Sequence, residues 1–310
     1  MQILVIGGTK FIGPYVVRQL HAQGHDVTVF HRGEHEVDLP GDVRHIHDPA
    51  AARPVLSFPP AVRELPLDVV VHMIPVGERD AQAAVDAFGR SVSRLVALSS
   101  GDVYRAYGRF NGIESGPVEH GALTESSAVR SVLYPYRKQA RSPDEWVYSY
   151  EKILVERVFL AGPTRAVVLR LPKVYGAEEN ADLATVYSFR HQPNWRWTHG
   201  YVENVAQSIV LAALHPAAAG IYNVGEKDTP TVAERLAHLP SSSIPEAATM
   251  NVNFDQDIVY DTTRIRAELE YSELVDYEEG LRRTLGHHHR LCPGAVGPVG
   301  RPPQPPNPGG

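Results

Sequence analysis

The stretch that decides the fold is Ile3-Leu4-Val5-Ile6-Gly7-Gly8-Thr9-Lys10-Phe11-Ile12-Gly13, near the start of a 310-residue chain. An apolar run leads into a glycine-containing turn, and an amphipathic helix is predicted to follow from Phe11 to His21. A strand, a tight turn and a helix N-terminus together direct backbone N–H groups and the helix dipole at one point. The sequence therefore predicts a pyrophosphate-binding turn at residues 7–13.

The first half of the chain alternates short apolar runs with helical patterns, which indicates a parallel sheet covered by helices on both faces. We expect an α/β fold with a Rossmann-type doubly wound parallel sheet. Helices are predicted at 11–21, 80–89 and 144–160. Strands are predicted at 2–6, 26–30, 43–46, 67–73, 94–99 and 166–171.

The second half is less regular and predicts a small, discontinuous lobe. We expect residues 1–175 to form the nucleotide-binding domain, with 201–225 returning to it, and residues 176–285 to form a substrate lobe. Residues 104–142 form a long connection without periodicity, which is typical of functional or mobile segments. Residues 286–310 are rich in Gly and Pro and are predicted to be disordered.

Composition excludes several classes of protein. The net charge of −6 argues against a nucleic acid as the main partner, since nucleic-acid-binding domains are usually basic. Cys292 is the only cysteine, so no intrachain disulfide is expected, and a catalytic thiol is disfavoured. The sequence contains neither a leader pattern nor an apolar run of membrane-spanning length, so a cytoplasmic location is expected.

Tyr148 and Lys152 form a candidate catalytic pair. Residues four apart share one face of a helix, where an ammonium can favour the ionised form of a phenol. Tyrosine then becomes usable as an acid or base at neutral pH. Such a pair also arises by chance, but here it follows the glycine turn and Ser100, which comes directly after a predicted strand.

The residues after the second strand favour NADP over NAD. An Asp or Glu usually binds the adenosine ribose there, whereas this chain has His31-Arg32 and no carboxylate until Glu34. Arg32, with Lys10 in the middle of the glycine turn, suits a 2′-phosphate. The alternative is that Arg32 is a solvated loop charge and that either cofactor, or neither, binds. Asp48 follows the third predicted strand, where it either accepts a hydrogen bond from the adenine amine or belongs to an ordinary surface turn.

The glycine turn and the Tyr148/Lys152 pair are accompanied by two further motifs of a known family. They are Leu98-Ser99-Ser100-Gly101-Asp102-Val103-Tyr104 and Leu169-Arg170-Leu171-Pro172-Lys173-Val174-Tyr175-Gly176. Over residues 1–285 the chain resembles the extended short-chain dehydrogenase/reductase superfamily, and within it the NAD-dependent epimerase/dehydratase family. The basic residue in the glycine turn and the segment 200–206 are similar to a divergent branch that includes the chloroplast stem-loop-binding proteins.

The resemblance implies roles for individual residues. Ser100 would hold the reacting oxygen of the substrate, and Tyr148 would be the general acid or base. Lys152 would donate a hydrogen bond to the nicotinamide ribose and lower the pKa of Tyr148. Tyr150 is a rival phenol, but it has no lysine four residues later. The resemblance also places Met73, Leu171, Pro172, Lys173 and Val174 in the cofactor site.

Differences from the family pattern argue against one of the family's reaction types. Sugar-nucleotide dehydratases carry an Asp-Glu pair after the catalytic Ser or Thr, whereas this chain has Gly101-Asp102, so a dehydratase is disfavoured. Asp102 and Arg196 are the candidate substrate-binding residues, although Arg196 is one position away from the usual diphosphate-binding arginine. Trp195 and Trp197 either stack on a nucleobase or belong to the core.

The motifs and the resemblance thus predict an NAD(P)-dependent oxidoreductase or epimerase that acts on a nucleotide sugar or a similar polyhydroxylated molecule, and the resemblance further implies a homodimer. Two alternatives remain open: an RNA-binding protein of the stem-loop-binding type, and a non-catalytic NAD(P)-sensing regulator. No metal site is predicted, because the run from His287 to His289 has no acidic or cysteine partners at ligand spacing.

Overall fold

The computed structural model describes residues 1–178, 183–246 and 252–291, and most of the predicted tail, with Cys292, lies outside these ranges. Its centre is a seven-stranded sheet in the order β3-β2-β1-β4-β5-β6-β9, in which every neighbouring pair is parallel. The predicted Rossmann-type sheet is confirmed. Its strands are β1 (Gln2–Ile6), β2 (Asp26–His31), β3 (Arg44–His47), β4 (Val69–His72), β5 (Arg94–Ser100), β6 (Arg165–Leu171) and β9 (Gly220–Asn223).

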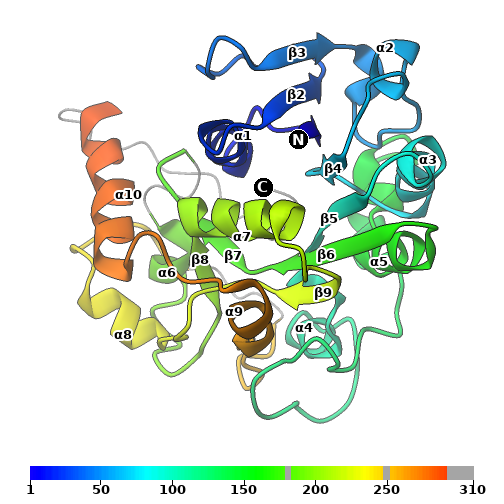
Figure 1. The fold of residues 1–310 in the computed structure, drawn as a ribbon. Coiled ribbons are helices and arrows are strands. Elements are labelled where there is room, and N and C mark those ends of the chain that lie inside the picture. The colour runs from blue at the N-terminus through cyan, green and yellow to red at the C-terminus, as the bar shows by residue number, and fades with distance from the viewer. Residues whose placement is uncertain (179–182, 247–251, 292–310) are drawn as a thin grey trace.

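Helices cover both faces of this sheet (Figure 1). The helices α1 (Ile12–Ala22) and α7 (Val202–Leu214) pack together on one face, and α2 (Pro60–Arg63), α3 (Glu78–Phe88) and α5 (Lys152–Ala161) cover the other. Alternate residues of a strand point to opposite faces, so Ile3 and Val5 enter the first core while Leu4 and Ile6 enter the second. Burial on both faces explains the near-continuous apolar runs of the inner strands.

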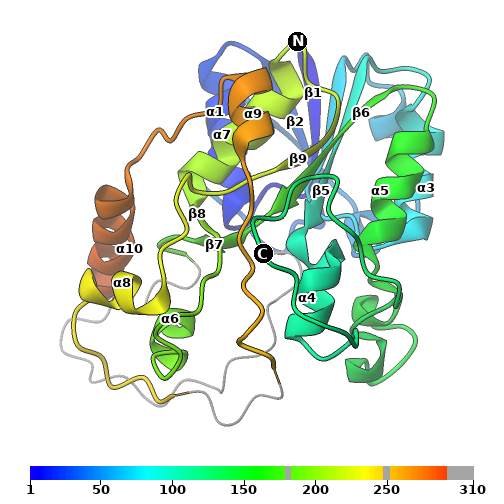
Figure 2. The same ribbon diagram turned by 90° about the horizontal axis from the view of Figure 1, so that it is seen from below.

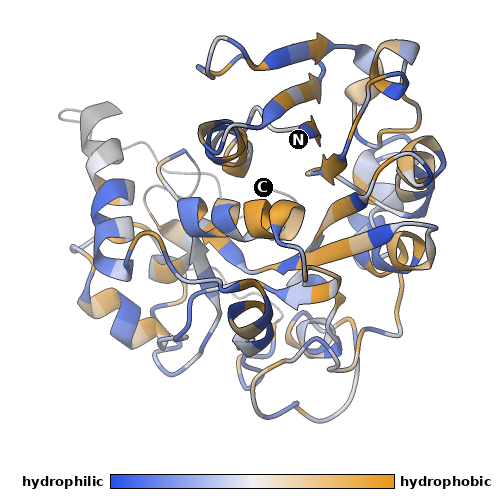
Figure 3. Cartoon of the chain, in the orientation of Figure 1, coloured by the Kyte–Doolittle hydropathy of each residue, from blue (hydrophilic) through white to orange (hydrophobic). Residues whose placement is uncertain are grey.

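A smaller lobe extends from the carboxyl edge of the sheet (Figure 2). It contains the two-stranded parallel sheet of β7 (Lys173–Tyr175) and β8 (His199–Tyr201). Its helices are α6 (Ala184–Ser188), α8 (Val232–Ala237) and α10 (Tyr277–Leu291), whereas α9 (Thr263–Leu269) packs against β9 and the core of the main sheet. The part of α10 that is coloured in Figure 3 is mainly hydrophilic, and the helix runs to Leu291, while the disordered tail stays a prediction.

Trp195 and Trp197 belong to a third hydrophobic core between the lobe and the long connection. Trp195 stacks on Phe110 with the ring centroids 4.9 Å apart, and its indole N–H donates to the Gln256 carbonyl at 2.9 Å. Trp197 is 8% exposed. Both rings are therefore core residues rather than a surface for a nucleobase.

The long connection 104–142 contains the helix α4 (Arg105–Phe110) and the short 3-10 helix η3 (Arg137–Gln139). Arg130 anchors it to the N-terminus of α5. The buried Arg130 guanidinium pairs with Glu151, with Nη2 and Oε1 3.0 Å apart, and also donates to the Asp102 carbonyl. No helix within residues 1–178, 183–246 and 252–291 is long and apolar enough to cross a membrane.

Candidate active site

The glycine turn has the geometry that a dinucleotide phosphate requires. Gly7 has φ 91°, a left-handed conformation that favours glycine. A Cβ on Gly13 would lie 2.3 Å from the Gly8 Cα, so only glycine lets α1 begin this close to the turn. Phe11 precedes α1 and provides no side-chain cap, which leaves N–H groups of the first turn for an anion. Met73 is buried beside Gly7, and its role in cofactor binding stays a prediction.

The end of β2 carries the residues expected at the adenosine ribose. Arg32 is exposed and pairs with Glu34, with Nη2 and Oε2 2.7 Å apart. Lys10 is exposed at the glycine turn. Asp48 accepts the Ala50 N–H at 2.7 Å and so caps the short 3-10 helix η1 (Pro49–Ala51), the ordinary turn role that was the alternative to adenine binding.

A group that the sequence analysis did not predict lies beside Arg32: His31, Glu36, His45 and His47, here called the histidine cluster. Burial, followed by the neighbouring rings of His47 and His45, lowers the pKa of His31 to about 4. The available signal was His45 and His47 at alternate positions of one strand, next to a strand that ends in histidine.

Ser100 is the last residue of β5, opposite Leu171 at the end of β6. Its hydroxyl accepts the Asp102 N–H at 3.3 Å and caps the short 3-10 helix η2 (Gly101–Val103). From Leu171 the chain continues through Pro172 into β7, so residues 171–174 leave the sheet beside Ser100.

Lys152 is the first residue of α5, and its side chain is buried beneath the same sheet edge. The ammonium donates to the Pro75 carbonyl at 2.5 Å and to the Leu98 carbonyl at 3.0 Å. Burial lowers the pKa of Lys152 to about 8, and the carboxylates of Asp102 and Asp80 oppose this shift.

The helix predicted to carry both Tyr148 and Lys152 does not form as one element. Tyr148 lies in a separate 3-10 helix, η4 (Trp146–Ser149), and the backbone is extended at Tyr150 and Glu151 before α5 begins. Glu151 fixes the start of α5, because its carboxylate accepts the Ile153 N–H at 3.0 Å as the N-cap and also pairs with Arg130. The prediction that Tyr148 and Lys152 share a helix face is therefore wrong.

The two tyrosines have different surroundings. The Tyr148 ring packs against the Arg137 guanidinium at 4.6 Å, and no hydrogen bond between described residues joins its side chain to Ser100 or Lys152. Tyr150 is 1% exposed, and its ring lies 5.6 Å from the Lys152 ammonium. Burial, with the neighbouring Asp102 carboxylate, raises the pKa of Tyr150 well above its ordinary value.

Ser100, Asp102, Tyr150 and Lys152, here called the Ser100 cluster, contain polar atoms without partners. Within the described residues, the buried Tyr150 hydroxyl and Asp102 Oδ1 make no hydrogen bond of normal geometry, although Asp102 and Ser100 lie close enough to the Tyr150 hydroxyl to shift its pKa. Asp102 Oδ2 accepts the Tyr136 hydroxyl at 3.1 Å, and burial raises the pKa of Asp102. Buried polar groups are usually paired, so unpaired ones at a sheet edge indicate a place for a ligand or water.

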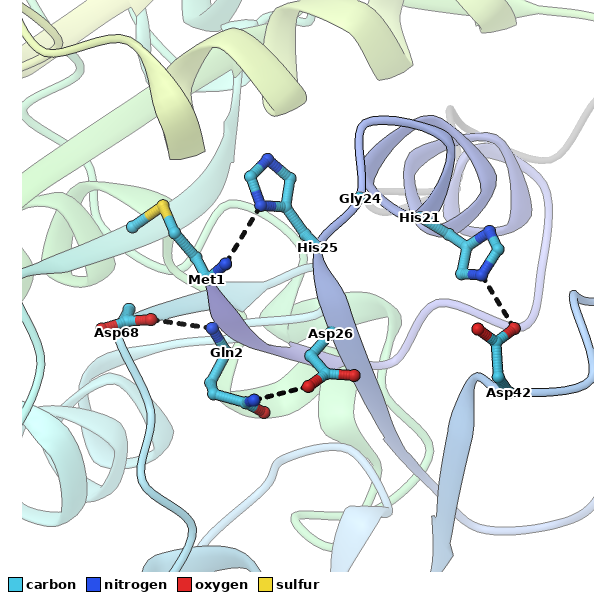
Figure 4. Close-up of a pocket in the computed structure, with 8 residues that line it drawn as sticks. All are labelled: Met1, Gln2, His21, Gly24, His25, Asp26, Asp42 and Asp68. Atoms are coloured by element: carbon cyan, nitrogen blue, oxygen red, sulfur yellow. Dashed lines mark hydrogen bonds and ion pairs between the residues drawn. The ribbon is translucent and has the colours of Figure 1, made fainter.

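The polar hollow at the opposite, amino ends of β1 and β2 differs in this respect (Figure 4). Its polar groups pair with one another: the Gln2 amide donates to Asp26 at 2.6 Å, and His21 lies 2.8 Å from Asp42. These internal pairs, together with the position away from the glycine turn, make it a poor candidate for the active site.

A model of the NAD-dependent epimerase/dehydratase family matches residues 3–225, which is well over half of the chain and includes the glycine turn, Ser100 and Lys152. The chain belongs to the NAD-dependent epimerase/dehydratase family. No curated protein matches it in sequence.

Solved structures share the family fold at low sequence identity. UDP-glucose 4-epimerase from Thermotoga maritima, with UDP-glucose, is 18% identical and has a TM-score of 0.67, covering 94% of this chain and 99% of its own. WbmG from Bordetella bronchiseptica, in complex with NAD, is 15% identical, with a TM-score of 0.68 and 94% of each chain covered. UDP-glucuronic acid 4-epimerase from Bacillus cereus, with NAD and a fluorinated UDP-glucuronic acid, is 16% identical, with a TM-score of 0.66, covering 94% of this chain and 100% of its own.

Gly101 has a structural reason in this family member. A Cβ at this position would lie 1.2 Å from the Tyr260 hydroxyl, which also donates to the Leu171 carbonyl at 3.4 Å. Tyr260 comes from the lobe and is 5% exposed. Unless Tyr260 moves, no side chain fits at position 101. This is the position at which, by the resemblance, a dehydratase carries the Asp of its Asp-Glu pair.

Arg196 is exposed on the lobe and does not join the Ser100 cluster. Its backbone N–H donates to Asp257 at 3.0 Å. No hydrogen bond or ion pair between described residues connects its side chain to Ser100 or Lys152. A role in substrate binding stays a prediction.

Proposed function

We propose that this family member is an NAD(P)-dependent enzyme that transfers hydride to or from a nucleotide sugar or a similar polyhydroxylated substrate, as an epimerase or a reductase. The observation that carries the proposal is the Ser100 cluster, in which the Tyr150 hydroxyl lies beside Ser100 and Asp102 without a hydrogen bond of normal geometry, on the sheet edge that also bears the glycine turn. Ligands of open α/β sheets bind at this edge. We take residues 176–285 as the substrate lobe.

The residues of the Ser100 cluster have distinct proposed roles. A bound nicotinamide supplies hydride transfer. Ser100 holds the reacting oxygen, and the Tyr150 hydroxyl exchanges a proton with it. In the resting site the raised pKa keeps Tyr150 protonated, which suits donation to a carbonyl. For the reverse direction, the Lys152 ammonium near the Tyr150 ring favours the phenolate.

Tyr148 is the second candidate for the acid/base, because it has the spacing to Lys152 that the family resemblance implies. Tyr148→Phe and Tyr150→Phe form a matched pair that decides between them. We expect Tyr150→Phe to lower turnover of UDP-glucose or UDP-glucuronic acid by about 10²–10⁴-fold with unchanged cofactor affinity. The turnover of Tyr148→Phe should stay within a few-fold of that of the unmodified protein. The reverse pattern would assign the role to Tyr148, and full turnover by both variants would refute tyrosine catalysis.

An epimerase or reductase is preferred to a dehydratase because Tyr260 fills the space beside Gly101. Product analysis separates the reactions. An epimerase returns an isomer of the same mass, a reductase consumes reduced cofactor, and a dehydratase releases a product lighter by one water. A dehydrated product would contradict this preference.

We propose NADP as the preferred cofactor because β2 ends without a carboxylate and is followed by Arg32. Arg32 would exchange its ion pair with Glu34 for one with the 2′-phosphate. Fluorescence titration should show tighter binding of NADPH than of NADH, and Arg32→Ala should remove the difference. Glu34→Gln, which frees Arg32, should enlarge it. Tighter binding of NADH by the unmodified protein would overturn the proposal.

The resemblance of segment 200–206 to the stem-loop-binding branch motivates RNA binding as a second function. RNA binding should then weaken steeply with added salt, since phosphate contacts release counterions. The net charge of −6 argues against this function, and binding without salt dependence would contradict it. The predicted homodimer and cytoplasmic location stay predictions.

A further inference from the structure

The histidine cluster follows from strand geometry. Side chains alternate along a strand, so His45 and His47 of β3 lie on one face of the sheet. The parallel register of β2 and β3 pairs His31 with His47, and their ring centroids are 4.4 Å apart. Glu36 reaches the same place from the loop between these strands, with its carboxylate 3.2 Å from His47 Nε2.

The distances within the histidine cluster match a compact coordination sphere. With zinc–nitrogen bonds of about 2.0–2.1 Å, the ligand atoms of a tetrahedral site lie about 3.3 Å apart. Here His31 Nε2 lies 2.9 Å from His45 Nδ1, and Glu36 lies 3.2 Å from His47 and 3.9 Å from His45. One ligand atom from each of the four residues lies within 4.8 Å of every other. Small rotations of exposed side chains would complete the sphere.

The cluster is both anchored and accessible. His31 is 5% exposed, whereas the side chains of His45, His47 and Glu36 are 23%, 49% and 60% exposed. Three imidazoles and one carboxylate are typical zinc ligands, and the open side gives an ion a route in. One proton has to move. His31 Nδ1 accepts the Gly33 N–H at a long 3.3 Å, and metal binding through Nε2 would place the ring proton on Nδ1 and break this weak hydrogen bond.

We propose that His31, Glu36, His45 and His47 bind one divalent transition-metal ion of the zinc class. The site lies away from the Ser100 cluster, at the outer strands of the sheet and next to Arg32, and it does not depend on the proposed reaction. Imidazole-rich sites also accept cobalt and nickel, which provides spectroscopic probes.

Zinc binding to the full-length protein tests the proposal. His287→Ala/His288→Ala/His289→Ala is the background, because the histidine run of α10 is a second potential zinc ligand. After chelator treatment, equilibrium dialysis against Zn²⁺ with elemental analysis should give one ion per chain at micromolar concentration. His45→Ala/His47→Ala in this background should bind at least 100-fold more weakly. His35→Ala removes an exposed histidine of the same loop and should bind like the background.

Cobalt reports the geometry of the site. Co²⁺ in the background protein should give the intense visible absorption of four-coordinate cobalt, which His45→Ala/His47→Ala should lose. His47→Asn changes only one half-exposed side chain and is the control for misfolding. Its circular dichroism spectrum without metal should match that of the background protein. Equal zinc affinity in the double variant, or binding by the background only at millimolar zinc, would overturn the proposal. So would a double variant whose only defect is weaker NADPH binding, because the cluster would then be a phosphate site.

Discussion

The Ser100 cluster and the histidine cluster are built differently, although both lie near carboxyl ends of strands in one sheet. The Ser100 cluster combines residues from β5, η2 and α5, and it is enclosed by Arg130 from the long connection and by Tyr260 from the lobe. The histidine cluster comes from residues 31–47 alone, on β2, β3 and their loop. The first is buried and depends on long-range packing, whereas the second is half open and depends on local strand register.

This difference predicts where each cluster is vulnerable. A buried group loses its geometry when a distant supporting residue changes, because its charges cannot be solvated once their partners are removed. In a solvent-exposed cluster, a substitution removes the contribution of the changed side chain and has little effect on the stability of the fold. Four changes test this contrast, from the largest expected effect to the smallest.

Arg130→Met should have the largest effect on stability. The change leaves Glu151, which is fully buried, without its cation, and breaking such a pair typically costs about 3–5 kcal/mol. Urea unfolding measures the loss. Arg137→Met, which removes a half-buried cation from two tyrosine rings, is the control and should cost about 1 kcal/mol or less. A similar small loss for Arg130→Met would show that the Ser100 cluster does not need its buried support.

Lys152 should make stability rise with pH. Its pKa of about 8 in the folded protein lies below the ordinary 10.5, so between these values the unfolded chain binds more protons. Stability should therefore increase from pH 8 upward, by as much as about 3 kcal/mol at the top of the window. Unfolding of the unmodified protein and of Lys152→Met, compared from pH 7 to 10, isolates this contribution. Parallel pH profiles would contradict it.

Gly101→Ala tests the contact between the lobe and the Ser100 cluster. The added methyl group overlaps the Tyr260 hydroxyl, and overpacking of this kind costs about 1–3 kcal/mol. A double-mutant cycle with Tyr260→Ala should show that the second change removes the penalty of the first. Additive losses would mean that the two residues do not touch in solution.

His47→Ala should have the smallest effect. In metal-free protein the half-exposed ring contributes little to stability, and we expect a change within about 0.5 kcal/mol. Thermal unfolding with and without Zn²⁺ measures both the basal value and the loss of metal stabilisation. A large basal loss would show that the histidine cluster, like the Ser100 cluster, is part of the supporting structure.

Local patterns predicted the sheet well and the candidate site in part. The glycine turn and six strands of the main sheet follow from short-range signals, as does Ser100 at the end of β5. The break between Tyr148 and Lys152 depends on Glu151 pairing with Arg130, twenty-one residues away, which no helical pattern shows. The overlap of Tyr260 with Gly101 depends on the lobe. The histidine cluster needs the register of two strands, which periodicity alone leaves open.

The contact of Tyr260 with Gly101 also limits how this enzyme can be recombined. The family match ends at residue 225, yet a residue beyond it forms one wall beside Ser100. A lobe transplanted from a relative would bring its own residue to this wall, and position 101 would have to change size with it. Under the proposed function, residue 101 and the lobe shape the substrate site together, so libraries that exchange the lobe should vary residue 101 with it.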